Sequence, residues 1–275
     1  MAGFFDGVVP GDEVTYGRAT FRLPILYFRD DFFALFFSAD ADRVRAALPS
    51  DSLYPVTMKG RAFIGIGAYN YIDTSIGPYG EVGVVVPVVY GRKPAPILPL
   101  LMESRYSGFG MVVLHLPVTT LVARDAGRGV WGYPKFTSDM RFVITPEFME
   151  CRLSEGGKHI FTIRVARRGV PIPDRRPLIT YTVKDGNLIK TAVQQKAIFR
   201  VSFKPRGSFL ELGDHEVADS LRDLGISTKP IQSRYALQRF GILPEGEVIE
   251  SGVRPLEGYR GQDREGSLEV AFTEG

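Results

Sequence analysis

The chain has 275 residues, of which 44% are hydrophobic and 24% are charged, close to the averages of folded globular proteins. This composition excludes a disordered tail, a coiled coil and a fibre, and the length allows one large domain or two small ones. The net charge of +3 comes without a block of basic residues, which argues against nucleic-acid binding.

Cysteine and histidine are scarce. Cys151 is the only cysteine, so the chain cannot form an internal disulfide. The histidines are far apart in sequence, and no C-x-x-C or H-E-x-x-H motif occurs, so we expect no metal site. The N-terminus has no features of a secretory signal, and the longest apolar stretches fall well short of the ~20 residues of a membrane helix. We therefore expect a cytoplasmic protein without membrane contact.

Short stretches rich in β-branched and aromatic residues predict many strands. In chain order they are residues 32–37, 62–71, 82–90, 111–123, 140–144, 159–165, 178–182, 197–203 and 268–272. Helices are expected after a cap at Asp40, ending at Leu48, and after a cap at Asp214. The proline-rich stretches 93–100 and 169–177 are predicted as loops. So few helices do not fit a doubly wound α/β fold, and we predict one mainly β (β-rich α+β) domain over residues 1–275.

The stretch Gly127–Gly132 matches the G-x-G-x-x-G pattern of dinucleotide-binding loops. That pattern works only where a helix begins within it, so that backbone amides and the helix dipole meet a pyrophosphate. Here Tyr133-Pro134 follows directly, and proline opposes a helix through this point. A nicotinamide-dependent reductase therefore remains only a weak third hypothesis.

The same stretch continues to Lys135, which follows the rigid Tyr133-Pro134 turn and is flanked by Trp131 and Phe136. Aromatic surroundings disfavour a charged ammonium relative to the neutral amine. A neutral lysine amine is a nucleophile toward ketones. The alternative interpretation of the local sequence is an ordinary surface lysine after a turn.

Several segments resemble the acetoacetate decarboxylase-like superfamily. Arg128–Lys135 resembles the family segment that carries a Schiff-base lysine, and Gly77–Val82 resembles the segment whose glutamate, here Glu81, points into the active site. Tyr27–Asp30 resembles the region that supplies an active-site arginine, here Arg29, and 207–248 resembles the closing segments. The resemblance implies an antiparallel sheet closed into a cone-like barrel around the lysine, with a few peripheral helices, and a homo-oligomer.

The chain departs from the family pattern at two positions beside the lysine. Gly129 stands where most relatives have glutamate, and Phe136 stands where true decarboxylases have a second lysine. Residues 93–107 look like an apolar insertion, expected to line the pocket or a subunit interface, or else to form a surface loop packed on the barrel.

These residues predict a carbon–carbon lyase. Lys135 would attack the ketone of a small oxo acid, and Glu81 would transfer protons or orient the amine. Either Arg29 or Arg128 would hold the substrate carboxylate. The remaining candidate substrate-binding residues are Tyr79, Trp131, Tyr133 and Phe136.

The type of reaction stays open. It is either decarboxylation of a 3-oxo acid such as acetoacetate, or aldol, dehydration or hydration chemistry on a 2-oxo acid. No cofactor is expected, because the lysine iminium itself serves as the electron sink. The alternative function is a non-catalytic barrel of the same fold that binds an apolar small molecule.

Overall fold

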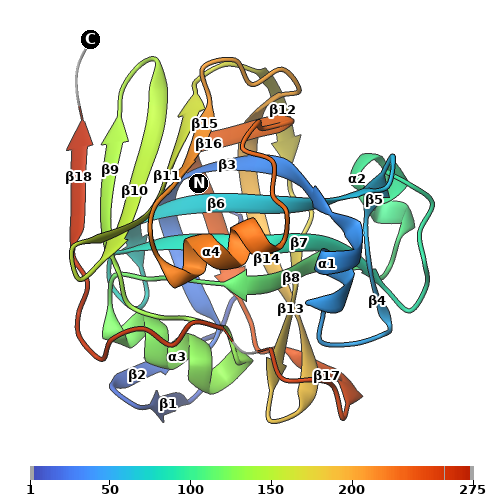
Figure 1. The fold of residues 1–275 in the computed structure, drawn as a ribbon. Coiled ribbons are helices and arrows are strands. Elements are labelled where there is room, and N and C mark those ends of the chain that lie inside the picture. The colour runs from blue at the N-terminus through green and yellow to red at the C-terminus, as the bar shows by residue number, and fades with distance from the viewer. Residues whose placement is uncertain (1–2, 257, 273–275) are drawn as a thin grey trace.

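The computed structural model describes residues 3–256 and 258–272, and strands dominate its regular structure (Figure 1). The strands are β1 (Glu13–Tyr16), β2 (Ala19–Arg22), β3 (Ile25–Asp40), β4 (Leu53–Pro55), β5 (Thr57–Met58), β6 (Arg61–Thr74), β7 (Tyr79–Tyr90), β8 (Phe109–His115), β9 (Asp139–Ile144), β10 (Phe148–Glu155), β11 (Lys158–Ala166), β12 (Val170–Asp174), β13 (Leu178–Lys184), β14 (Asn187–Ser202), β15 (Phe209–Leu212), β16 (Gln232–Leu243), β17 (Glu247–Ser251) and β18 (Leu268–Phe272). The helices are α1 (Ala41–Ala46), α2 (Leu98–Leu101), the 3-10 turn η1 (Glu103–Arg105), α3 (Leu121–Trp131) and α4 (Glu216–Asp223).

A closed barrel forms the centre of the molecule. Among the described residues, seven strands make the ring in the order β7-β8-β13-β14-β16-β3-β6, and β6 pairs with β7 to complete it. Neighbours in the ring run antiparallel except β8 and β13, which are parallel. Strands β4, β5, β12 and β17 extend the ring at its edges. The predicted mainly β architecture, with its closed barrel and few peripheral helices, is confirmed.

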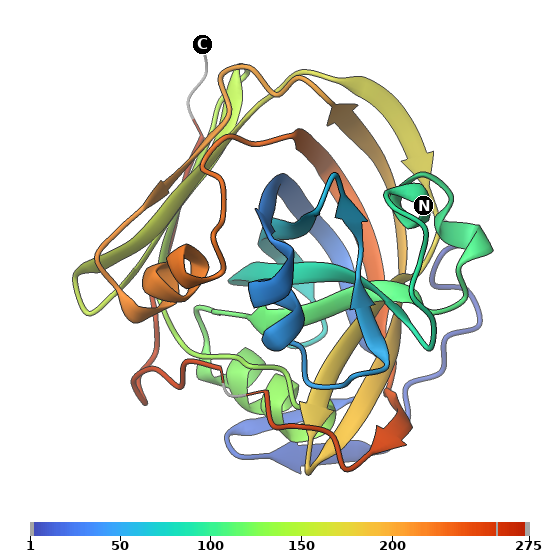
Figure 2. The same ribbon diagram turned by 45° about the vertical axis from the view of Figure 1, so that its right-hand side comes forward.

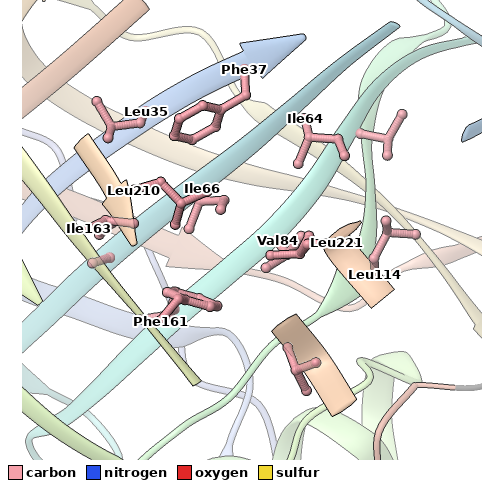
Figure 3. Close-up of a cluster of buried hydrophobic side chains, with 14 of the residues drawn as sticks. Leu35, Phe37, Ile64, Ile66, Val84, Leu114, Phe161, Ile163, Leu210 and Leu221 are labelled. Atoms are coloured by element: carbon pink, nitrogen blue, oxygen red, sulfur yellow. The ribbon is translucent and has the colours of Figure 1, made fainter. Parts of the chain in front are cut away.

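A second sheet, in the order β15-β11-β10-β9-β18, packs against the outside of the barrel. The main hydrophobic core lies between them, where side chains of β3, β6 and β7 meet those of β11, β15 and α4 (Figure 3). Successive side chains of a strand point to opposite faces. Phe33, Leu35 and Phe37 therefore enter this core, whereas Phe32, Ala34 and Phe36 line the barrel interior. The nearly continuous apolar run of β3 is explained by burial on both faces.

The helices agree only in part with the sequence-based expectation. Asp40 caps α1 as predicted, its carboxylate accepting from the backbone N–H groups of Asp42 and Arg43. The later helix, α4, is capped by His215, one residue after Asp214. No helix in the described ranges is long and apolar enough to cross a bilayer.

The largest difference concerns residues 111–123, which were expected to form one strand. Strand β8 ends at His115, and α3 begins at Leu121 after Thr120, whose hydroxyl accepts from the N–H of Ala123. The strand ends before Pro117, because proline has no N–H to donate to a neighbouring strand. Thr120 then caps a helix, although the surrounding residues are typical of a strand. The expected proline-rich loop at 169–177 is also corrected, because β12 pairs with β14 at the sheet edge, where prolines are tolerated.

A histidine joins the barrel to α4. Nε2 of His115 lies 2.9 Å from Oγ of Ser220, and that hydroxyl donates to the carbonyl of Val217. The serine therefore accepts, and Nε2 carries the proton. Burial lowers the pKa of His115 to about 4, and the charge of His215 acts in the same direction.

We expect His115 to stabilise the fold in a pH-dependent way. A histidine with a depressed pKa stabilises most above its unfolded value of about 6.5, and this contribution is lost as pH falls toward 4. His115→Gln keeps a donor near Ser220 but cannot titrate. The difference in unfolding free energy between wild type and variant should shrink by roughly 2 kcal/mol from pH 7 to pH 5, measured by urea denaturation. An unchanged difference would contradict the assignment.

Candidate active site

Lys135 is positioned by the end of α3. Gly132 closes the helix in the left-handed region, with φ of 66°, and Tyr133 N–H bonds back to the carbonyl of Gly127. A Cβ on Gly132 would lie 2.3 Å from the carbonyl oxygen of Val183, so both conformation and space require glycine there. The glycine pattern thus lies at the C-terminal end of a helix, where carbonyl groups rather than amides face outward.

Lys135 and Glu81 form a buried ion pair. Nζ of Lys135 lies 2.8 Å from Oε2 of Glu81, and the two residues are 4% and 7% exposed. The hydroxyl of Tyr71 donates to the other carboxylate oxygen at 3.2 Å. Nζ also lies 5.6 Å from the ring centre of Tyr79 and 5.9 Å from that of Tyr133. A carboxylate, a hydroxyl and two aromatic faces therefore surround the amine.

The pair lines a cavity of about 130 Å³ inside the barrel, which is room for a small ligand. Most of its wall is aromatic or aliphatic. Gly65 and Gly67 of β6 keep it open, since a Cβ at these positions would meet the rings of Phe36 and Phe32 at 2.9 and 3.1 Å.

Regular alternation along β3 decides which charged residue faces the barrel interior, because Asp30 lies on the same face as Phe32 and Ala34. The register of β3 against β6 shifts at Arg29, so Tyr27 and Asp30 both point inward. Arg29 is exposed on the outer surface, and the structure does not bring it to the cavity. Asp30 instead forms a buried ion pair with Arg239 of β16, whose Nε lies 3.0 Å from Oδ1. Burial raises the pKa of Asp30 to about 6, against the opposing effect of the Arg239 charge.

Arg128, the other expected carboxylate ligand, is engaged with the backbone. Its Nε donates to the carbonyl of Lys135 at 2.6 Å and its Nη2 to that of Arg260 at 2.9 Å. Burial, with a contribution from the Arg124 charge, lowers the pKa of Arg128. This arrangement holds the lysine backbone in place and directs the guanidinium away from the cavity.

The four expected aromatic residues divide into two groups. Tyr133 lines the cavity and its hydroxyl lies 2.8 Å from that of Thr180. Tyr79 does not line the cavity but faces Lys135 from the adjoining hydrophobic cluster, where its hydroxyl lies 3.2 Å from that of Tyr27. Burial raises the pKa of both tyrosines above the usual range. Trp131 and Phe136 lie in hydrophobic cores instead.

Trp131 and Phe136 are each fixed by one specific contact. The indole N–H of Trp131 donates to the carbonyl of Pro244 at 2.8 Å. Phe136 packs edge-to-face on Tyr259, with ring centres 4.9 Å apart. These contacts anchor both sides of the segment that carries Lys135.

Sequence reasoning did not identify Tyr69, Tyr71, Asp30 and Arg239 as site residues. Tyr69 and Tyr71 were detectable as aromatic residues at alternate positions of a predicted strand, on the same face as Gly65 and Gly67. Arg239 lacked such a signal, because bulges in β16 bring both Arg234 and Arg239 to the inner face, whereas strict alternation would separate them.

The segment 93–107 contains α2 and η1 and packs on the barrel through Leu100 and Tyr106. Glu103 forms an ion pair with Arg176 at 3.0 Å. This segment borders a second cavity of about 300 Å³, which shares Met111, Leu178, Gln195 and Arg234 with the first. The segment thus lies beside the candidate site as a packed loop. Within the described ranges, no group of three or more His, Cys, Asp and Glu residues is placed to hold a metal ion.

We expect a double-mutant cycle to reveal strong coupling between Lys135 and Glu81. Lys135→Met and Glu81→Gln each leave one buried charge unpaired, which should cost about 3–5 kcal/mol of unfolding free energy. The double variant removes both charges, so its loss should be smaller than the sum by at least about 2 kcal/mol. Urea unfolding measures all four proteins, and simple additivity would contradict the buried ion pair.

Solved structures of the same fold support the barrel assignment. Acetoacetate decarboxylase from Legionella pneumophila superposes with a TM-score of 0.63 at 19% identity, covering 90% of this chain and 94% of that chain. The enduracididine biosynthesis enzyme MppR complexed with pyruvate also gives 0.63, at 14% identity over 88% and 99%. An acetoacetate decarboxylase-like enzyme from Sphingomonas wittichii RW1 gives 0.56, at 15% identity over 83% and 94%.

Two sequence comparisons, one with curated proteins and one with family models, complement the structural similarity. No match is found among curated proteins. The family model for acetoacetate decarboxylase matches residues 14–250, a range that includes Glu81, Lys135 and all strands of the barrel ring. The chain therefore belongs to the acetoacetate decarboxylase family.

Proposed function

We propose that this protein is an enzyme that forms a Schiff base between Lys135 and the ketone of a small oxo acid. The observation that carries the proposal is the 2.8 Å contact between Lys135 Nζ and Glu81 Oε2 at the wall of a largely apolar cavity. An amine and a carboxylate in contact can exchange a proton directly, and the amine released in this way is a nucleophile.

The first half of the reaction uses one proton twice. The ammonium of Lys135 transfers a proton to Glu81, and the neutral amine attacks the ketone carbon to form a carbinolamine. Glu81 returns its proton to the departing oxygen, which leaves as water. The products are an iminium on Lys135 and a carboxylate on Glu81, so charge and protons balance.

The iminium then accepts an electron pair from a neighbouring bond. With a 3-oxo acid, the bond to the carboxylate breaks, carbon dioxide leaves and an enamine forms, and its carbon then takes a proton from water to restore the iminium. With a 2-oxo acid, Glu81 removes a proton from the adjacent carbon, and the enamine adds to an aldehyde, with dehydration or hydration as later steps. Water finally hydrolyses the iminium and frees Lys135. The lysine supplies the electron sink in both branches, so neither needs a cofactor.

Structural neighbours support both branches. The solved structures include acetoacetate decarboxylases and MppR with pyruvate or with the condensation product of pyruvate and imidazole 4-carboxaldehyde. We assign Tyr79 and Tyr133 to the walls around the reacting carbon, because their rings lie nearest the amine. Arg128, Trp131 and Phe136 would act on the lysine through the backbone and the packing that hold it.

A non-catalytic binding barrel is the second candidate. The mostly apolar cavity wall favours it, since such surfaces bind small apolar molecules without chemistry. We further propose that the protein acts in the cytoplasm as a homo-oligomer. Exposed Val170, Ile172, Ile198 and Phe203, on or beside β12 and β14, support an assembly surface.

Reductive trapping tests the Schiff base. Wild-type protein is incubated with acetoacetate or pyruvate, reduced with borohydride and mapped by mass spectrometry. We expect a stable adduct on Lys135, because borohydride converts an iminium into a secondary amine. Lys135→Met should give no adduct. Lys135→Arg is the matched control, since it keeps a cation beside Glu81 but cannot form an imine.

The outcomes separate the two candidates. An adduct on Lys135 together with turnover supports the enzyme. Binding of oxo acids without any adduct across the panel supports the binding barrel. Turnover retained in a folded Lys135→Met variant would contradict the assignment of the lysine.

Gly127 should prove essential for the reach of the lysine. A Cβ at this position would lie 2.6 Å from both Cδ and Cε of Lys135, so Gly127→Ala must displace the side chain. Gly129→Ala is the matched control in the same helix, because its Cβ would meet Tyr16 of the β1–β2 hairpin instead. We expect the trapping rate to fall at least about tenfold in Gly127→Ala and much less in Gly129→Ala. Equal rates would contradict this geometry.

A further inference from the structure

A second buried ion pair, of which Arg239 lines the cavity, is not used by the chemistry of Lys135 and Glu81. Asp30 is 0% exposed and Arg239 is 3% exposed, and the two are cross-strand partners between β3 and β16 (Figure 1). Asp30 faces inward in regular alternation with Phe32 and Ala34, and a bulge in β16 turns Arg239 to the same side. Bulges of this kind commonly re-aim side chains next to active sites.

The guanidinium of Arg239 keeps one edge available. Asp30 accepts from Nε only, end-on at 3.0 Å. Among the described residues, no hydrogen bond uses Nη1 or Nη2 of Arg239. Neither of these atoms is fully buried without a partner, so both have access to the cavity that Arg239 lines. A pair of parallel N–H groups matches the two oxygens of a carboxylate.

This edge lies close to the reactive pair. The Arg239 guanidinium carbon lies 4.9 Å from the ring centre of Tyr69 and 6.0 Å from that of Tyr71. The hydroxyl of Tyr71 bonds to Glu81, which in turn bonds to Lys135. Tyr71 therefore lies beside both charged pairs, and Lys135 and Arg239 line the same cavity.

The other arginines near the cavity are less suited to a carboxylate. Arg29 is exposed on the outer surface, and Arg128 holds the backbone of Lys135. Arg234 lines the cavity, but its Nη2 donates to Gln232, and the negative charges of Glu103 and Asp174 act on it.

We propose that Arg239 binds the carboxylate of the oxo acid and that Asp30 is the positioning residue that holds its guanidinium. The inference rests on the proposed function for the ketone at Lys135, but the carboxylate anchor is testable without it. The substrate class is thereby narrowed to acids with a free carboxylate, and neutral ketones of the same size are poor ligands.

The test compares charged and neutral ligands. Acetoacetate and acetoacetamide have the same length and differ in charge, and the concentration that gives half-maximal borohydride trapping is measured for each. Calorimetry with 3-hydroxybutyrate, which has a carboxylate but no ketone, measures anion binding without lysine chemistry. The first variant is Arg239→Gln. The second combines Asp30→Asn with Arg239→Gln, so that no buried charge is left unpaired. Arg29→Gln is the control at an exposed position.

We expect wild type to prefer acetoacetate to acetoacetamide. In the folded double variant the half-maximal acetoacetate concentration should rise about 10- to 100-fold, the range for a lost charge-assisted hydrogen bond. The value for acetoacetamide should stay nearly constant, and 3-hydroxybutyrate binding should be lost. Arg29→Gln should behave like wild type.

The failures are distinguishable. Equal weakening of acetoacetate and acetoacetamide, or no weakening of either, would overturn the anchor while the lysine adduct still forms. A second outcome is that wild type gives no adduct but binds 3-hydroxybutyrate, and that the double variant loses this binding. That outcome supports the carboxylate anchor and overturns the Schiff base. A large effect of Arg29→Gln with none in the double variant would move the anchor to β3 and overturn the proposal.

Discussion

The buried contact between Lys135 and Glu81 constrains the rest of the molecule. Two opposite charges removed from water lose several kcal/mol of hydration each, and their attraction offsets this only when the geometry is good and the remaining polar atoms are bonded. Tyr71 supplies one such bond, and the rings of Tyr79 and Tyr133 face the ammonium. A closed barrel fixes all of these groups at once, because none of its strands in the ring has a free edge along which it can slip. The second sheet covers the barrel from outside and completes the core (Figures 2 and 3).

Small residues provide the space in which this pair operates. Gly65 and Gly67 leave room for phenylalanine rings, so the cavity stays open beside a densely packed wall. Gly127 lets the lysine side chain pass the last turn of α3, and Gly132 ends that helix against the backbone of β13. The glycine content of this chain thus serves close approach of side chains and backbone as well as turns.

Irregularities in two neighbouring strands determine the charge pattern of the cavity. A regular β3 would place Tyr27 and Arg29 on one face, and a regular β16 would place Arg234 and Arg239 on opposite faces. The bulge in β3 turns Tyr27 to the same side as Asp30, and the bulge in β16 brings Arg239 to Asp30. The family motif predicts a positive charge from β3. Inside this barrel the adjacent strand, β16, provides that charge instead.

Local sequence determined much of this protein. Residue type and alternation predicted most strands, Asp40 marked the start of α1, and the resemblance of Arg128–Lys135 and Gly77–Val82 to family segments identified the two residues that meet in the cavity. Tertiary structure decided the rest. The helix α3 follows an apolar run that reads as a strand, and the second sheet completes a core that no single segment specifies. The inward position of Arg239 beside Asp30 depends on a bulge in β16. A bulge is a property of the register between two paired segments, here about 200 residues apart, which neither segment encodes alone.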